Sequence, residues 1–146
     1  MHRLAKSTFL AGLQCHKRLW FQVHEPDAPE LTPDPESQRR MDEGSRVGRV
    51  AREHVPGGVL VGSWYQTVDA RLSATREALA AGERVLYEAN ALADGVLVQA
   101  DILERQGDAF TLVEVKSTTK LKDEHIPDVA VQVWVLRRAG VPVRRA

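Results

Sequence analysis

Cysteine is almost absent from this sequence of 146 residues, since Cys15 is the only one. One thiol excludes an internal disulfide bond and any metal site built from four thiolates of this chain. No apolar run approaches the roughly 20 residues that a membrane-spanning helix needs, and the polar first residues do not resemble a signal peptide. We therefore expect a cytoplasmic protein with no membrane partner.

The sequence also has no excess of positive or negative charge. The chain has 20 Lys and Arg residues against 20 Asp and Glu residues, which gives a formal net charge of zero. This balance excludes a nucleic-acid binder that relies on its overall charge, although it leaves room for a local basic groove. Hydrophobic residues make up 43% of the chain, enough for one core, so we expect a single domain over residues 1–146.

The order of the predicted elements indicates a mixed α/β fold. Apolar periodicity and capping signals predict helices over about residues 8–23, 36–54, 67–81 and 125–139. Strands are predicted over residues 59–61, 84–89, 95–104 and 110–116, and residues 141–146 resemble the start of another strand. Residues 24–35 form a proline-rich loop. The prediction is a mixed β-sheet flanked by helices, in a fragment or a shortened version of a longer chain that lacks one or more C-terminal strands.

The most informative stretch is a predicted hairpin whose turn is Gly107-Asp108. A two-residue turn at this place fixes the register of the two strands. In that register Asp101 lies directly opposite Glu114, and Lys116 lies on the same face as both. The opposite face of the hairpin is apolar and is expected to face the core, with Ala100, Ile102, Val113 and Val115.

Two opposed carboxylates have chemical consequences. Directly opposite side chains have Cβ atoms about 4.5–5.5 Å apart, where like charges repel each other. Such a pair either shares a proton or holds a cation, and Mg²⁺ or Mn²⁺ suits a site made of oxygen ligands. Lys116 could orient or deprotonate a metal-bound water, or offset charge on a phosphate. The set suits phosphodiester hydrolysis, and the alternative is a solvated strand face with a weak ion pair.

Gln132 lies inside an apolar stripe of the last predicted helix. A buried amide needs hydrogen-bond partners. On a helix packed against the sheet, this amide could point toward the two carboxylates or toward a substrate phosphate. The alternative is a bond to the backbone of a nearby loop.

Taken in order, Asp101, Glu114-Val115-Lys116 and Gln132 resemble the motifs of the PD-(D/E)XK nuclease superfamily in its RecB-like branch. The segment from Lys6 to Trp20 is similar to CRISPR-associated RecB-like exonucleases and to a related uncharacterised prokaryotic family. The resemblance implies a restriction-endonuclease-like core and a metal-dependent DNA nuclease, an exonuclease of DNA repair, recombination or defence. It implies that Asp101 and Glu114 hold Mg²⁺ or Mn²⁺, that Lys116 is the catalytic lysine, and that Gln132 completes the site from a helix.

The chain departs from this family pattern in ways that bear on activity. Gly48 stands where many relatives have a histidine, and His54 lies about 240° further round the helix. Leu136 replaces the tyrosine that follows the family's glutamine. Cys15 matches the first of four cysteines that hold an iron–sulfur cluster in some relatives, so a cluster would need a missing C-terminal region. The alternative function is therefore a catalytically inactive module that binds nucleic acid or a partner protein.

Five further basic residues are the candidate contacts to DNA, including single-stranded DNA. Positive charge around one cleft would bind phosphates with a steep dependence on salt concentration. Ordinary charged surface explains these residues equally well. They are Lys17, Arg18, Lys120, Lys122 and Arg137.

Overall fold

Three consecutive strands form the centre of the sheet. The computed structural model describes residues 3–63 and 65–146. In it, β3 (Val85–Ala93) pairs antiparallel with β4 (Val96–Gln106). Strand β4 in turn pairs antiparallel with β5 (Ala109–Val113). The parallel strands β2 (Val59–Leu60) and β6 (Val143–Arg145) complete the order β2-β3-β4-β5-β6, and β1 (Leu4–Ala5) pairs with the beginning of β4. The prediction of a mixed sheet is confirmed.

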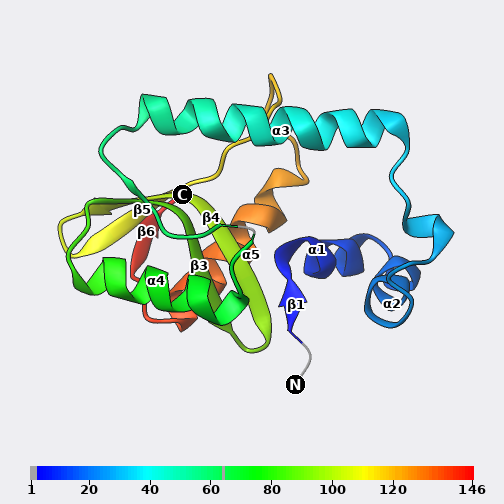
Figure 1. Cartoon of the computed structure of the whole chain (residues 1–146), viewed down its shortest axis with the longest axis horizontal. Coiled ribbons are helices and arrows are strands. Elements are labelled where there is room, and N and C mark those ends of the chain that lie inside the picture. Colours follow the sequence, from blue (N-terminus) through cyan, green and yellow to red (C-terminus); the bar gives the residue numbers. More distant parts are fainter. Residues whose placement is uncertain (1–2, 64) are drawn as a thin grey trace.

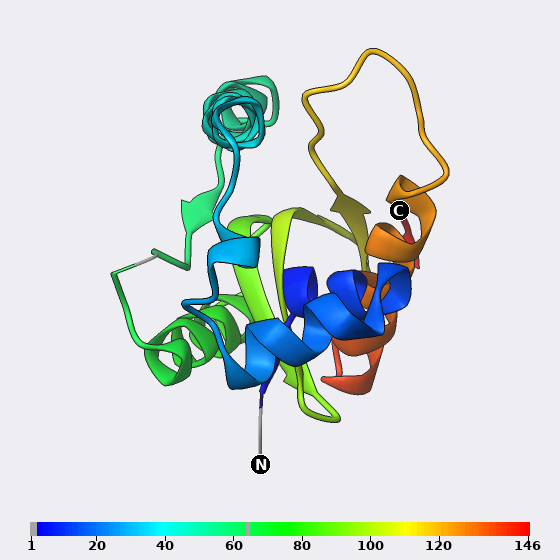
Figure 2. The ribbon, with the colours of Figure 1, turned by 90° about the vertical axis from the view of Figure 1, so that its right-hand side faces the viewer.

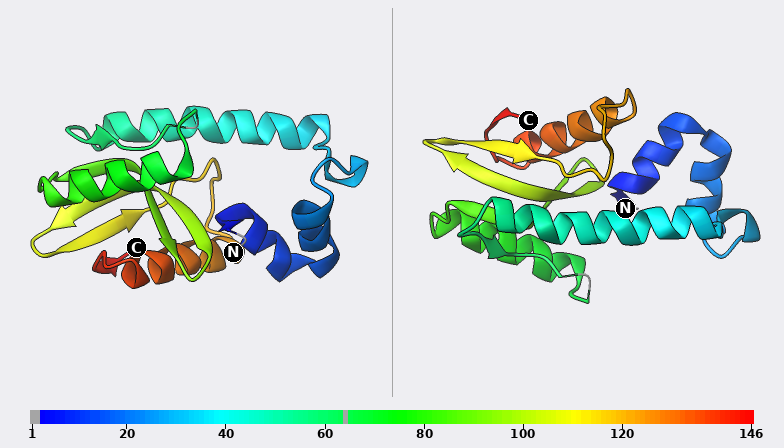
Figure 3. Two further views of the ribbon diagram at one scale, coloured as in Figure 1. Left: turned by 60° about the horizontal axis from the view of Figure 1, so that its bottom comes forward. Right: turned by 90° about the horizontal axis from the view of Figure 1, so that it is seen from above.

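Helices flank this sheet, as the sequence predicts (Figure 1). The sheet lies between α4 (Val68–Ala80) and α5 (His125–Arg138), which cover opposite faces (Figure 2). The long helix α3 (Pro35–His54) passes over one end of the sheet, and α1 (Lys6–Gln14), α2 (His16–His24) and the short 3-10 helix η1 (Pro29–Leu31) lie beside it (Figure 3). No helix within residues 3–63 and 65–146 is long and apolar enough to cross a bilayer.

The main core contains three leucines that are paired with one another across the strands. Leu86, Leu103 and Leu112 occupy one row of β3, β4 and β5, and all three are at most 2% exposed. Val135 and Leu136 of α5 belong to the same cluster. Each such side chain contributes roughly 1.5–3 kcal/mol when it leaves water. This layer fixes α5 against the strands and thereby sets the position of every side chain at the beginning of that helix.

A second, smaller cluster joins α3 to the sheet. Its buried members are Val85, Tyr87 and Ile102, and Ala51 and Val55 of α3 pack against them. The Tyr87 hydroxyl donates to the carbonyl of Val55 and accepts from the amide of Gly58 at 3.1 Å. Tyr87 therefore anchors the C-terminal end of α3 and the chain that leaves it.

The prediction of one helix over residues 8–23 was wrong, because the chain breaks at Cys15. This residue is extended, with φ −156° and ψ 112°, and separates α1 from α2. Gly12 allows α2 to fold back, since a Cβ there would lie 2.9 Å from Cδ2 of Leu19. Apolar residues continue through the break at helical spacing, and periodicity alone therefore conceals it.

The proline-rich segment is not wholly a loop, because η1 lies within it. The segment ends where Asp34 caps α3, with its side chain accepting from the amide of Ser37 at 2.7 Å. Pro35 follows at the first helical position, where its missing N–H costs no hydrogen bond. Local capping chemistry thus explains why α3 begins close to its predicted start.

Candidate active site

Asp101 and Glu114 lie beside each other where β5 ends. The predicted register is confirmed, but the ladder between β4 and β5 stops at the pair Ile102–Val113, just before the two acids. Beyond it, the Asp101 carboxylate accepts a hydrogen bond from the backbone amide of Val115 at 2.7 Å. The predicted strand over residues 110–116 therefore ends early, because like charges oppose pairing and a side chain takes the next backbone donor.

The Asp101 carboxylate is disfavoured as an anion. Burial raises the pKa of Asp101, and the nearby Glu114 charge raises it further, to about 6. The amide of Val115 and the charge of Lys6 act in the opposite direction, but more weakly. A cation bound between the two acids would favour the ionised form, so this pair has a physical reason to bind one.

Four charged side chains form a closed ring of ion pairs next to Asp101. Lys6 Nζ lies 2.9 Å from Glu114 Oε1 and 2.8 Å from Asp128 Oδ1. Lys116 Nζ lies 2.6 Å from the same Glu114 oxygen and also contacts Asp128 Oδ2. The side chains of Glu114 and Asp128 are only 7% and 10% exposed, and their burial depends on this mutual neutralisation.

The ring keeps Lys116 and Asp128 ionised. Burial alone would lower the pKa of Lys116, but hydrogen bonds to Asp128 and Glu114 raise it above its ordinary value. Burial would raise the pKa of Asp128, whereas its hydrogen bonds with Lys116 and Lys6 lower it. A charged ammonium has no lone pair to accept a proton. In this arrangement Lys116 can therefore orient a water or neutralise negative charge, but it cannot deprotonate the water.

Gln132 is fully buried and reaches the acids from α5. Its Nε2 donates to Glu114 Oε2 at 2.8 Å and to Asp128 Oδ1 at 3.1 Å. Its Oε1 has no hydrogen-bond partner within the part of the chain that the structure describes. The structure thus brings together all four side chains that the sequence singled out: Asp101, Glu114, Lys116 and Gln132.

Asp101, Glu114 and Lys116 line a cleft of about 950 Å³, whereas Gln132 lies behind it and is fully buried. The strands and the segment after β5 supply its acidic side, with Asp101 and Glu114. Helix α3 supplies the opposite wall, where Gly44 and Gly48 have no atoms within 4 Å of the position of a Cβ. Figure 2 shows α3 and the segment after β5 on either side of the space above the sheet. The cleft is therefore open to a ligand much larger than a metal ion.

Sequence reasoning missed Lys6 and Asp128 as site residues. Asp128 carries a usable signal, because it precedes Gln132 by four residues and so shares its helix face. Lys6 carries no local signal, since it is 108 residues from Glu114 and reaches the site through the pairing of Leu4 with Val96.

The basic residues that line the cleft differ from those proposed as DNA contacts. Lys6, Lys116 and two arginines of α3, Arg49 and Arg52, line it. Lys120 and Lys122 lie exposed in the segment after β5, and Lys17 and Arg18 lie on α2. Arg137 is at the far end of α5 from Gln132, where its Nε donates to the carbonyl of Val143 at 2.8 Å.

The remaining candidate metal ligands do not join the site. His54 is exposed on α3 with its Nδ1 3.1 Å from the carbonyl of Val50, and Cys15 is exposed at the α1–α2 break. In residues 3–63 and 65–146, no three His, Cys, Asp or Glu side chains are grouped to hold a metal. The pair Asp101 and Glu114 nevertheless fits Mg²⁺ or Mn²⁺, because Mg²⁺ sites use one or two carboxylates together with water and substrate phosphates.

Comparison of the chain with protein-family models, with curated proteins and with solved structures found no match. Fold alone does not define function, since one architecture can serve many activities. The chemistry of the cleft is therefore the basis on which a function can be assigned.

Proposed function

We propose that this protein is a metal-dependent nuclease that hydrolyses phosphodiester bonds in DNA, with the RecB-like core that its motifs imply. The observation that carries the proposal is the placement of Asp101 beside Glu114 in the cleft, with Lys116 in contact with Glu114. Gln132 supports it, because its amide holds Glu114 from the other side. Carboxylate oxygens, a cation and an open cleft are what hydrolysis of a phosphodiester requires.

The residues have separate roles in this reaction. Asp101 and Glu114 hold Mg²⁺ or Mn²⁺, which when bound supplies a more acidic water and stabilises negative charge on the phosphate. Lys116 stays protonated and orients the attacking water or neutralises charge that develops on the phosphate. Gln132 fixes the orientation of Glu114 through the bond to Oε2. The guanidinium group of Arg49 binds a flanking phosphate from the wall of the cleft, whereas that of Arg52 is held in an ion pair with Glu88.

Two substitutions test the proposal against a matched control. Asp101→Asn and Lys116→Met are each expected to reduce Mn²⁺-dependent cleavage of single-stranded DNA by about 100-fold or more. Arg76→Gln removes an exposed positive charge of α4 outside the cleft and is expected to leave the rate unchanged. Cleavage by both cleft variants at the rate of the unmodified protein would contradict the proposal.

A second candidate function is a catalytically inactive module that binds nucleic acid or a partner protein in the same cleft. The observation that favours it is the ring itself, because two lysines already neutralise Glu114. Calorimetry with Mn²⁺ and with DNA separates the two functions. DNA binding without Mn²⁺ binding supports the inactive module, whereas binding of both supports the nuclease.

A further inference from the structure

We propose that the ammonium of Lys6 takes the place of a divalent cation on Glu114 in the metal-free protein, and leaves Glu114 for Asp128 when a metal ion binds. The inference rests on the proposed function, because it concerns the same pair of acids. It assigns to Lys6 the role of a resident competitor that sets the affinity of the site for metal.

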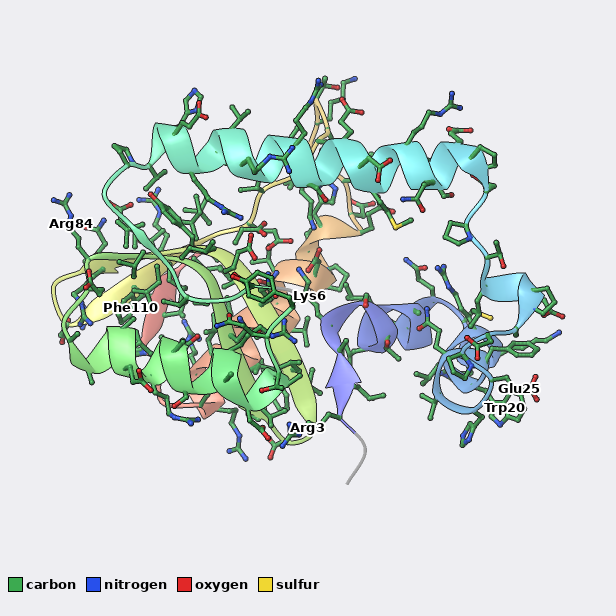
Figure 4. All side chains as sticks on the ribbon, viewed as in Figure 1. Arg3, Lys6, Trp20, Glu25, Arg84 and Phe110 are labelled. Carbon is green, nitrogen blue, oxygen red and sulfur yellow. The ribbon has the colours of Figure 1, made fainter. Side chains whose placement is uncertain are left out.

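The position of Lys6 is the first argument. Its ammonium lies 2.9 Å from Glu114 Oε1, and Lys6, Asp101 and Glu114 line the same cleft. One cation is therefore already in contact with one acid of the proposed metal site and shares the cleft with the other. Figure 4 labels Lys6 between the sheet and α1, at the start of that helix, and its side chain lines the cleft.

The occupancy of Glu114 is the second argument. Lys6 and Lys116 both donate to Oε1, and Gln132 donates to Oε2. Oε1 therefore already has two donors, whereas Oε2 has one, so a metal ion that binds through Oε1 has to displace a lysine. Gln132, the donor to Oε2, is fully buried and does not line the cleft, whereas both lysines on Oε1 do line it, so the lysines are the donors that an ion entering the cleft meets.

Lys6 and Lys116 differ in the chain segment that carries each of them, and Lys6 has a second ion pair that it can keep. Lys116 is two residues from Glu114 on the same segment, whereas Lys6 reaches in from α1, a separate element. When Lys6 leaves Glu114 it keeps its ion pair with Asp128 Oδ1 at 2.8 Å. Its departure therefore leaves no buried charge without a partner, since the metal takes over on Glu114.

Lys6 is expected to lower the affinity of the site for a divalent ion. In the unmodified protein, an incoming divalent ion has to break the ion pair of Lys6 and then lie close to its positive charge. Lys6→Met removes both obstacles and keeps a side chain of similar length. We expect it to tighten Mn²⁺ binding by about tenfold or more, which corresponds to about 1.4 kcal/mol. Lys6→Arg keeps the charge and is expected to retain weak binding.

The test is calorimetric titration of Mn²⁺ into the full chain and its Lys6→Met, Lys6→Arg and Lys120→Met variants. Tighter binding in Lys6→Met alone supports the inference. Equal binding in all four proteins, or weaker binding in Lys6→Met, overturns the inference while the proposed function stands. Absence of Mn²⁺ binding in all four refutes the metal site and the inference together.

A second measurement keeps the inference testable should Lys6→Met fail to fold. NMR of the lysine ammonium groups in the unmodified protein follows Lys6 directly during titration with diamagnetic Mg²⁺. The Lys6 signal is expected to shift on binding while that of exposed Lys120 stays in place. A Lys6 signal that does not move while Mg²⁺ binds would overturn the inference.

Discussion

Replacing Asp101 by asparagine is expected to stabilise the protein, although Asp101 lies at the centre of the proposed site. Asparagine keeps an oxygen to accept the hydrogen bond from the Val115 amide. It removes the charge that is partly buried next to Glu114. The substitution thus separates stability from function, because it also removes a proposed metal ligand.

The magnitude follows from the pKa of Asp101. Its value is 3.8 in an unperturbed carboxyl and about 6 in the folded protein. A difference of about two pKa units corresponds to about 3 kcal/mol. Because the folded-state value is raised, the folded protein binds the proton more tightly than the unfolded chain. The free energy of unfolding of the unmodified protein therefore falls by up to this amount as the pH rises from about 4 through 6. The asparagine variant has no carboxyl at this position and does not show this fall.

Urea unfolding at about pH 4 and about pH 8 measures the effect. The free energy of unfolding of Asp101→Asn is expected to exceed that of the unmodified protein by up to about 3 kcal/mol at the higher pH and by little at the lower. Asp123→Asn, at an exposed position, is the control and is expected to change little at either pH. A variant that is equally destabilised at both pH values would refute the reasoning.

Three further predictions concern the ring and the two clusters. Asp128→Asn is expected to destabilise the protein near pH 7, and urea melts should show this effect shrinking as the pH falls below about 4. The stability that comes from the lowered pKa of Asp128 is fully present above 3.8 and is lost as the pH falls from there through the folded-state pKa. Tyr87→Phe leaves a carbonyl at the end of α3 without its hydroxyl partner and should cost about 1–3 kcal/mol in thermal unfolding. Leu103→Ala should cost about 2–5 kcal/mol of unfolding free energy, whereas Leu121→Ala, at a side chain 82% exposed, should change it by less than about 0.5 kcal/mol.

The central hairpin was predictable because its information is local. Gly107 adopts φ +65°, as the turn requires, and the turn fixes which residues meet across the two strands. Strict alternation of faces then brings Asp101 to Glu114 without any knowledge of the rest of the chain. The contribution of Gln132 from α5 was predictable for a similar reason, since this amide lies within the apolar stripe of Val129, Val133 and Leu136.

The basic half of the site was not predictable, because distant parts of the chain supply it. Lys6 follows a strand of only two residues, too short to leave a pattern in the sequence. Arg49 and Arg52 lie on a helix whose place over the sheet depends on Tyr87 and a few apolar contacts. The break at Cys15 was not predicted, because the apolar residues keep their helical spacing across it although the helical backbone conformation stops there.

The two glycines with which α3 lines the cleft affect both the stability of this helix and the width of the cleft. Each glycine inside a helix costs about 1 kcal/mol relative to alanine, and α3 carries two of them, at positions 44 and 48. A methyl group at either position would strike nothing, so the double alanine variant is expected to make the helix firmer. The same two methyl groups would narrow the passage beside the acids. The double alanine variant is therefore expected to be more stable and to have a narrower cleft.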